Sequence, residues 1–175
     1  MAERKSQNSV KITCYCGTAE NWNESKMKAI IFIGIQSTGK STFFQQQFFN
    51  THVRINLDML RTRNRERILL AACLQAKQPF VIDNTNLTHQ GRVGYISQAK
   101  AAGFSVTGYY FKSALKAALE RNRQRSGKAL IPEKGIIGAY RKLELPSFDE
   151  GFDRLFYVEI AEGGQFIVKE WSDEV

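Results

Sequence analysis

The sequence predicts an α/β fold in which a five-stranded parallel sheet carries helices on both faces. Short apolar runs rich in β-branched residues alternate with longer segments of helical periodicity between about residue 29 and residue 160. This alternation favours a parallel sheet, because each intervening helix returns the chain to the same edge. In addition, a glycine-containing loop separates the first apolar run from the first helical segment, as in proteins that bind phosphate groups.

The expected strands are largely continuous apolar runs, which are typical of strands buried on both faces. They are 29–35 (AIIFIGI), 53–57 (VRINL), 79–84 (PFVIDN), 105–111 (SVTGYYF) and 154–160 (RLFYVEI). The next segment, 161–171 (AEGGQFIVKEW), contains a Gly-Gly pair followed by alternating apolar residues. That pattern predicts a C-terminal β-hairpin at the edge of the sheet.

The expected helices are 41–49, 65–77, 91–103, 114–125 and 132–142. Pro132 suits the first turn of the last helix, because the backbone N–H that proline lacks has no partner at that position. The stretch 126–130 (SGKAL) interrupts the helical pattern. We therefore expect a flexible connection between the last two helices.

Length and composition favour one globular domain. The chain has 175 residues, and residues 1–26 are polar with little periodicity, so we expect a flexible N-terminal extension and one domain over 27–175. Cys14, Cys16 and Cys73 cannot pair evenly and do not complete a zinc site, so we expect free thiols. No apolar run reaches the about 18 residues that a membrane span requires, and no secretory signal is recognisable, so we expect a cytoplasmic protein without a membrane partner.

The charge of the chain bears on its partners. A formal net charge of +8 favours a polyanionic partner such as nucleic acid. A solvated basic surface without a partner would give the same charge, so charge alone does not decide between the two.

The segment Gly34-Ile-Gln-Ser-Thr-Gly39-Lys40-Ser41 matches the pattern G-x-x-x-x-G-K-[ST] between an expected strand and an expected helix. The glycines let successive N–H groups point at phosphate oxygens, and the helix N-terminus adds the positive end of its dipole. Lys40 is expected to reach the β and γ phosphates, and Ser41 to bind Mg²⁺ through its hydroxyl. The sequence thus predicts a nucleoside triphosphate site formed by Gly34, Gln36, Ser37, Thr38, Gly39, Lys40, Ser41 and Thr42.

Polar residues follow the second expected strand, at the carboxyl edge where open α/β sheets bind ligands. In INLDMLR, Asp58 and Arg61 are three residues apart and would share one face of a helix. Phosphoryl transfer to a hydroxyl group needs a base that accepts the hydroxyl proton, and Asp58 is the candidate. An aspartate that caps the following helix is the alternative interpretation.

A second polar group follows the third expected strand, in VIDNTNLTHQGR. Asp83 comes after an apolar run, as does a carboxylate that holds Mg²⁺ in phosphate-transferring enzymes, and we expect it to share the metal with Ser41. Asn84, Thr85 and Asn86 can position substrate oxygens, although an ordinary Asx turn would use the same residue types. Arg92, at the end of the stretch, completes the expected substrate-binding set.

Basic residues outnumber acidic ones between residues 112 and 142, and Arg121, Arg123 and Arg125 precede the flexible connection. Arginines above a transferring phosphoryl group neutralise the charge of the transition state, and a closing lid excludes water. We expect such a lid over about 121–134. The spacing cannot place all three arginines on one helix face, so Arg123 is expected to point outward.

The segments GIQSTGKST, INLDMLR, IDNTNLTHQGR and LERNRQR resemble, in order and spacing, the polynucleotide 5′-hydroxyl kinase branch of the P-loop kinases, which also includes toxin kinases of similar layout. The resemblance runs from about Met27 to about Val158. It implies a three-layer P-loop NTPase fold, a general base at Asp58, an arginine for the acceptor-side phosphate at Arg61, and lid arginines at Arg121 and Arg125.

The asparagine-rich turn departs from one pattern within that family. In the bacteriophage enzyme the acidic residue falls at the position of Asn84, whereas Asp83-Asn84-Thr85-Asn86 is similar to the mammalian kinase domain. The division of roles between Asp83 and Asn84 therefore stays open.

We expect a kinase that uses ATP and Mg²⁺ and whose acceptor is the 5′-hydroxyl end of RNA or DNA. A kinase for a small hydroxyl compound, such as a nucleoside, a sugar or a nucleotide sugar, would use the same loop, base and lid. A non-catalytic nucleotide-binding module that regulates a partner would need only the loop.

Overall fold

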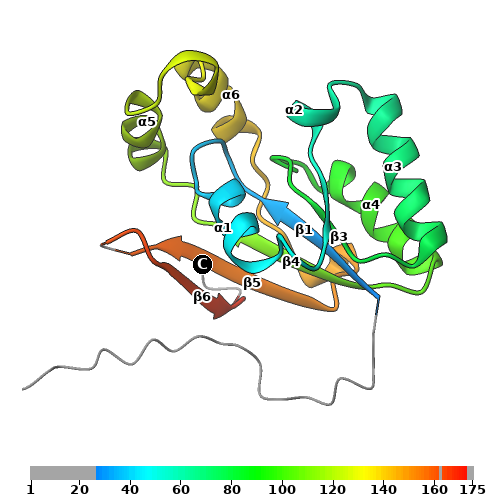
Figure 1. Ribbon diagram of the computed structural model, residues 1–175. Helices are drawn as coiled ribbons and strands as arrows, with labels where there is room; N and C mark the ends of the chain where they lie inside the picture. Colours follow the sequence, from blue (N-terminus) through cyan, green and yellow to red (C-terminus); the bar gives the residue numbers. More distant parts are fainter. Residues whose placement is uncertain (1–26, 162, 173–175) are drawn as a thin grey trace, which may run out of the picture.

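The computed structural model describes residues 27–161 and 163–172, and the expected flexible extension 1–26 lies outside them, as do Cys14 and Cys16. Strands and helices alternate along the chain as predicted (Figure 1). The strands are β1 (Lys28–Ile33), β2 (Val53–Ile55), β3 (Phe80–Ile82), β4 (Ser105–Phe111), β5 (Arg154–Ile160) and β6 (Phe166–Glu170). The α-helices are α1 (Lys40–Gln47), α2 (Leu57–Leu60), α3 (Arg63–Ala76), α4 (His89–Ala101), α5 (Leu115–Arg123) and α6 (Glu133–Lys142), with 3-10 turns at Gly127–Ala129 and Phe148–Glu150.

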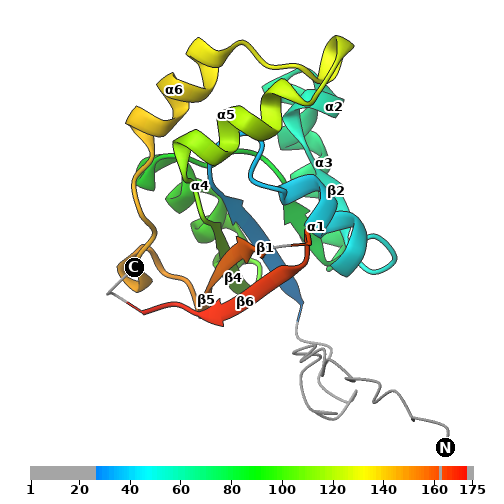
Figure 2. The same ribbon diagram turned by 90° about the vertical axis from the view of Figure 1, so that its left-hand side faces the viewer.

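The six strands form one sheet in the order β2-β3-β1-β4-β5-β6. The first five are parallel to their neighbours, and β6 pairs antiparallel with β5 as the predicted edge hairpin (Figure 2). The predicted α/β fold with five parallel strands and a C-terminal hairpin is therefore confirmed. Because β1 lies between β3 and β4, the chain leaves it where the strand order reverses, which is where sheets of this kind bind ligands.

Helices cover both faces of the sheet, and the side chains of β1 point alternately to one face and to the other. Ile31 and Ile33 pack in a cluster with residues of α3 and α4, including Leu70 and Ile96. Phe32 points to the opposite face and packs with residues of α1 and β4. Both faces of the central strand are thus buried, as its continuous apolar sequence predicts.

A third apolar cluster joins α5 and α6 to the loop after β1. Ile35, the second residue of that loop, packs with Ala118 of α5 and with Ile136 and Ala139 of α6. Figure 1 shows α5 and α6 on one side of this loop, with α2 and α3 on the other. The loop therefore lies between two groups of helices.

The helix predicted at 65–77 differs from the observed structure at its N-terminal end. A separate short helix, α2, follows β2, and Arg61 ends it in the left-handed conformation with a φ of 68°. The Asn56 side chain caps α2, and the Thr62 side chain caps α3. These two caps start two helices where periodicity alone predicts one. Within the described ranges, no helix is long and apolar enough to cross a membrane.

Candidate active site

The loop between β1 and α1 is held tightly against its neighbours. Gly34 has a φ of 143°, and a Cβ on it would lie 2.9 Å from the carbonyl oxygen of Phe111. Gly39 has a φ of 90°, and a Cβ on it would lie 2.9 Å from the ring of Phe166. Only glycine fits both the backbone angles and the space at these positions, so the two residues fix the shape of the loop.

Two buried polar side-chain atoms of the loop lack a hydrogen-bond partner. The Ser37 hydroxyl and the Gln36 Oε1 atom are buried and find no hydrogen-bond partner among the described residues. Thr38 is also buried, but its hydroxyl donates to the Ile35 carbonyl at 2.9 Å. Because buried polar atoms are nearly always paired, the two orphaned atoms fit a loop that takes an external polar ligand.

Lys40 lies across this loop. Its Nζ donates to the carbonyl oxygens of Gly34, at 2.8 Å, and Ile35, and the residue is 8% exposed. Burial lowers the pKa of Lys40 to about 8, with the positive charge of Arg125 adding to the effect and the carboxylate of Asp83 opposing it. A buried ammonium group in this position is stabilised by an anion, so the loop is suited to phosphate.

A hydroxyl and a carboxylate meet beside Lys40, as expected for a shared metal. The Ser41 hydroxyl donates to Asp83 Oδ2 at 3.3 Å, and a guanidinium nitrogen of Arg54 contacts both oxygens. Hydroxyl and carboxylate oxygens are ligands that Mg²⁺ accepts, and the cation already bridging them shows that the pair tolerates positive charge. The described residues contain no cluster of three or more histidine, cysteine, aspartate or glutamate side chains that would hold a metal alone. The donors therefore fit Mg²⁺ that brings further ligands with it, such as nucleotide phosphates and water.

Asp58 and Arg61 lie at the two ends of α2, and both are exposed. Asp58 is close enough to Lys40 to raise the pKa of the lysine. Within the described residues, no side chain forms an ion pair with Asp58. An exposed carboxylate beside the phosphate loop is free to contact an acceptor.

The position of α2 is set by two asparagines. The Asn56 amide group donates to the Asp83 carbonyl, and its Oδ1 accepts the Met59 N–H at 3.1 Å. Asn84 Oδ1 accepts the Leu57 N–H at 2.8 Å. The end of β3 therefore holds the short helix that carries Asp58, and Asn84 positions this helix through its side chain.

Glu66 of α3, which the sequence interpretation did not single out, orients Asn84. It is 4% exposed and accepts hydrogen bonds from Asn84 Nδ2 at 2.6 Å, from Tyr95 Oη at 3.0 Å and from Arg63 Nη1 at 2.7 Å. A buried carboxylate with three donors is a rigid support. Its sequence signal is weak, because it is one acidic residue in the basic segment 61–67 and its partner Tyr95 lies on another helix.

The rest of the asparagine-rich turn supports the fold. The Thr85 carbonyl accepts the Gly34 N–H at 3.0 Å, which ties the turn to the phosphate loop. Asn86 donates to the carbonyl oxygens of Phe32, at 2.7 Å, and Ile82. Thr85 and Asn86 therefore support the phosphate loop and the end of β1 through hydrogen bonds within the protein.

Arg92 does not lie where the sequence interpretation placed it. It is completely buried, and its guanidinium group pairs with Glu150. The remaining donors contact four carbonyl oxygens, those of Asn86, Leu87, Glu144 and Leu145. The guanidinium N–H groups donate to partners within the protein. The expectation that Arg92 contacts the substrate was therefore wrong, and Arg92 is a structural residue.

Of the three arginines at and just after the C-terminal end of α5, Arg121 and Arg125 lie near the phosphate loop. Arg121 Nε donates to the Ser37 carbonyl at 2.7 Å, and burial, with the charge of Arg125, lowers the pKa of Arg121. Arg125 is exposed and lies close enough to Lys40 to lower the pKa of the lysine. Arg123 points away and pairs with Glu133 at 2.8 Å, as expected. Three cationic groups, Lys40, Arg121 and Arg125, thus lie around the loop.

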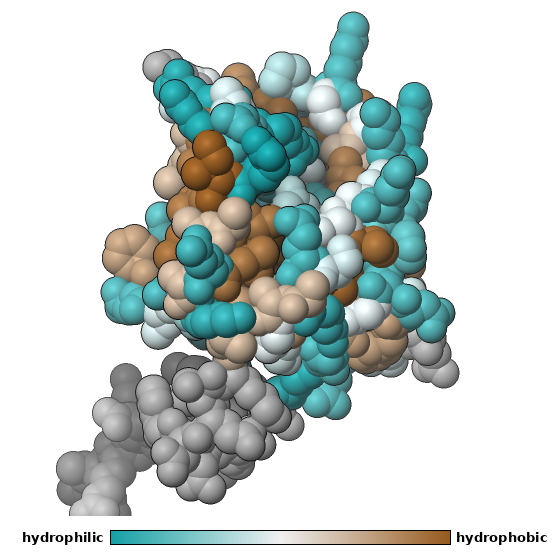
Figure 3. All heavy atoms as spheres, turned by 90° about the vertical axis from the view of Figure 1, so that its right-hand side faces the viewer, coloured by the Kyte–Doolittle hydropathy of each residue, from teal (hydrophilic) through white to brown (hydrophobic). Residues whose placement is uncertain are grey.

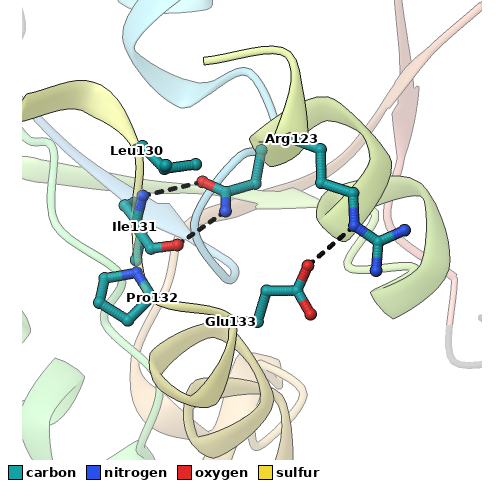
Figure 4. Close-up of a pocket in the computed structure, with 6 residues that line it drawn as sticks. Arg123, Leu130, Ile131, Pro132 and Glu133 are labelled. Atoms are coloured by element: carbon teal, nitrogen blue, oxygen red, sulfur yellow. Dashed lines mark hydrogen bonds and ion pairs between the residues drawn. The ribbon is translucent and has the colours of Figure 1, made fainter. Parts of the chain in front are cut away.

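The connection between α5 and α6 is fastened by Asn122. This residue is completely buried, and it exchanges two hydrogen bonds with the backbone of Ile131, at 2.7 and 3.1 Å (Figure 4). A pocket of about 400 Å³ opens beside it, lined by Asn122, Arg123, Leu130, Ile131, Pro132 and Glu133. The charged groups of this pocket pair with each other, so it offers no free catalytic group and the chemistry belongs to the loop between β1 and α1.

Comparison with known sequences identifies relatives of the chain. A family model described as "AAA domain" matches residues 30–136. The bifunctional polynucleotide phosphatase/kinase of Schizosaccharomyces pombe (strain 972 / ATCC 24843) is 26% identical over 127 residues, which cover 70% of this chain and 31% of that protein. The chain thus spans about a third of the length of the curated relative that it matches.

Several solved structures are similar in fold. A gluconokinase from Sinorhizobium meliloti 1021 is 20% identical with a TM-score of 0.55, over 77% of this chain and 83% of that one. Kti12 of Chaetomium thermophilum, solved with ADP-AlF3, is 16% identical with a TM-score of 0.58, over 78% and 92%. A chain of the PezAT toxin-antitoxin system of Streptococcus pneumoniae is 13% identical with a TM-score of 0.62, over 82% and 71%. At such identities these similarities concern the fold.

Proposed function

The chain belongs to the AAA domain family and has the fold of P-loop kinases, and from this premise we propose that it transfers the γ phosphate of ATP to the 5′-hydroxyl end of a polynucleotide. The observation that carries the proposal is the attachment of α2, with the exposed Asp58, to Asp83 and Asn84 at the end of β3, next to the phosphate loop. The relative from Schizosaccharomyces pombe, described as a polynucleotide phosphatase/kinase, supports the choice of acceptor.

The nucleotide would bind through the loop residues 34–42. The backbone N–H groups at the start of α1 and the Lys40 ammonium group face the phosphates, and the orphaned side chains of Gln36 and Ser37 gain a partner there. Ser41 and Asp83 would hold Mg²⁺, which, when bound, neutralises charge on the phosphate oxygens.

In the proposed transfer step, the nucleotide lies at the phosphate loop and the acceptor lies on the side of Asp58. The oxygen of the acceptor hydroxyl attacks the γ phosphorus and the bond to the β-phosphate oxygen breaks, so that ADP leaves. The hydroxyl proton passes to the Asp58 carboxylate, which stands exposed on the acceptor side. Arg61, at the end of the same helix, would bind the phosphate of the acceptor.

The segment 121–134, with the rest of α6 behind it, would act as the lid. Arg121 and Arg125 supply positive charge where the phosphoryl group carries the most negative charge in the transition state. Ile35 links the loop to α5 and α6 through their shared apolar cluster, so movement of the lid is coupled to the loop.

A group of four arginines beside the site favours a polyanionic acceptor over a small neutral one. Arg61, Arg63, Arg65 and Arg67 are all exposed, and hydrophilic side chains project from this face of α3 and α4 among hydrophobic patches (Figure 3). Within the described residues, only Arg63 of these four arginines forms an ion pair, with Glu66. Arg65 donates to the Leu60 carbonyl at 3.3 Å and Arg67 to Asn64 Oδ1 at 2.9 Å, so both keep their charge without a carboxylate partner. The arginines of α3 are spaced two residues apart and point in different directions, so they would attract a polyanion as a group of charges.

The test is transfer of label from γ-labelled ATP, with Mg²⁺, to single-stranded RNA and DNA that carry a 5′-hydroxyl, with nucleosides and sugars as competing acceptors. We expect label at the oligonucleotide 5′ end and a Michaelis constant for the oligonucleotide that rises steeply with salt. Arg65→Gln and Arg67→Gln should raise that constant. Arg154→Gln, on strand β5 at the other end of the sheet, is the matched control.

Other outcomes assign other functions. Label on a small hydroxyl compound alone would identify a small-molecule kinase. ATP binding without label on any acceptor would contradict the proposal and favour a nucleotide-binding module.

A further inference from the structure

Arg54 is a charged residue in the short strand β2, and its side chain is 23% exposed. Its guanidinium group crosses from β2 to the start of α1 and the end of β3. Nε donates to Asp83 Oδ2 at 2.8 Å, and Nη2 donates to the same oxygen and to Ser41 Oγ at 2.8 Å. One cation thus contacts both residues that are proposed to hold Mg²⁺.

The rest of the side chain is supported on both sides. Its guanidinium carbon lies 5.3 Å from the centre of the Phe44 ring, and Nη1 contacts the Met59 sulfur at 3.7 Å. These contacts keep the group in place without a second carboxylate. Arg54 is therefore held between α1, α2 and β3 at one position.

Asp83 needs such a cation. The residue is 2% exposed, and a buried carboxylate is strongly destabilising when no positive charge or donor compensates it. Lys40 is the other cation near Asp83, but its Nζ is bonded to the carbonyl oxygens of Gly34 and Ile35. Among the described residues, the direct ion pair to Asp83 comes from Arg54.

We propose that Arg54 is an internal counter-ion that occupies the metal position of the nucleotide-free protein and competes with Mg²⁺ for Ser41 and Asp83. The inference rests on the metal role proposed for these two residues, and not on the identity of the acceptor. In the free protein Arg54 neutralises Asp83. Mg²⁺ that binds with the nucleotide would replace Arg54 at both oxygens, and the guanidinium group would then be free to contact a phosphate.

This exchange has a functional consequence. Mg²⁺ alone must displace a guanidinium group that makes three hydrogen bonds, and it gains few ligands in return. Mg²⁺ that arrives with nucleotide phosphates gains their oxygens as ligands and offers Arg54 a new anion. The site is therefore kept closed to the metal until the nucleotide binds.

The test compares Mg²⁺ binding by wild type and Arg54→Met, which keeps an apolar chain against Phe44 and removes the charge. Calorimetric titration and thermal unfolding are recorded with MgCl₂ alone, and then with ADP. We expect Arg54→Met to bind Mg²⁺ at least about tenfold more tightly, and Mg²⁺ to raise its melting temperature without raising that of wild type. Arg154→Met is the matched control, because Arg154 also lies over an aromatic ring, at 4.8 Å, beside an exposed carboxylate.

An affinity of Arg54→Met for Mg²⁺ equal to or below that of wild type would overturn the inference. If Arg54→Met folds only when Mg²⁺ is present, the metal has replaced the counter-ion and the inference stands. If Arg54→Met does not fold in either buffer, Arg54→Lys is measured instead, because a lysine makes fewer of the three hydrogen bonds. Tighter Mg²⁺ binding by Arg54→Lys than by wild type supports the exchange, and equal or weaker binding rejects it.

A further variant separates this inference from the proposed function. Asp83→Asn should remove the effect of Mg²⁺ on ADP affinity. If wild type shows no such effect of Mg²⁺, the proposed metal site fails. If the effect is present and Arg54→Met behaves as wild type, only the counter-ion role fails.

Discussion

Replacing the buried Arg92 tests whether it is a structural or a substrate-binding residue. The structural role predicts a loss of folding stability that can be calculated. Arg92→Met would leave Glu150, which is 5% exposed, without its cation, and would leave four backbone carbonyl oxygens without a donor. Removing one partner of a buried ion pair costs about 3–5 kcal/mol. For a domain of this size, 1 kcal/mol corresponds to about 2–4 °C, so the melting temperature should fall by roughly 6–20 °C.

The assay is thermal unfolding followed by circular dichroism, together with urea unfolding at one temperature. Arg92→Lys, which keeps one charge–charge contact, should lie between wild type and Arg92→Met. The double variant Arg92→Met with Glu150→Met should recover much of the loss, since neither charge is then left alone. A loss below about 1 kcal/mol, accompanied by a raised Michaelis constant for the acceptor, would refute the structural role and restore the substrate contact.

Three further predictions concern the active site. The pKa of Lys40 is lowered to about 8, and a bound triphosphate favours its ammonium form, so ATP affinity should be full below pH 8 and decline above it. Calorimetry should show that ATP binding takes up protons near pH 8–9, and Lys40→Met should abolish this uptake. Glu66→Gln should lower the turnover number while leaving the Michaelis constant for ATP unchanged, because Asn84 and α2 lose their support; a change in the ATP constant alone would contradict this. Arg125→Gln should slow transfer by about 100-fold, whereas Arg123→Gln, whose arginine pairs with Glu133 outside the site, should be close to wild type; equal effects would reject the lid assignment.

The phosphate loop was predictable because its signal is local. Gly34, Gly39, Lys40 and Ser41 stand at fixed spacing between a strand and a helix that are each evident from periodicity. The order of strands and helices followed from the same periodicity. The relative from Schizosaccharomyces pombe, described as a polynucleotide phosphatase/kinase, agrees with the expected resemblance to polynucleotide kinase-like P-loop kinases. The short helix α2 was missed, because four residues are too few to show a period.

The interior of the site was less predictable, because its contacts join residues far apart in sequence. Arg92 and Glu150 are separated by 58 positions, and Arg54 and Asp83 by 29. A sequence pattern shows that an arginine follows a polar turn, but not whether its side chain turns inward to a partner on another element. Sequence alone therefore predicts a substrate contact for Arg92, which the structure contradicts, and assigns no role to Arg54 or Glu66.

The proposed transfer reaction depends most directly on Asp58, since its carboxylate is the group that would accept the proton. The decisive measurement compares Asp58→Asn with wild type in label transfer from γ-labelled ATP to a 5′-hydroxyl oligonucleotide, alongside the dissociation constant for ATP. We predict that transfer falls by at least about 100-fold while ATP affinity is unchanged. Transfer by Asp58→Asn at the wild-type rate would contradict the account.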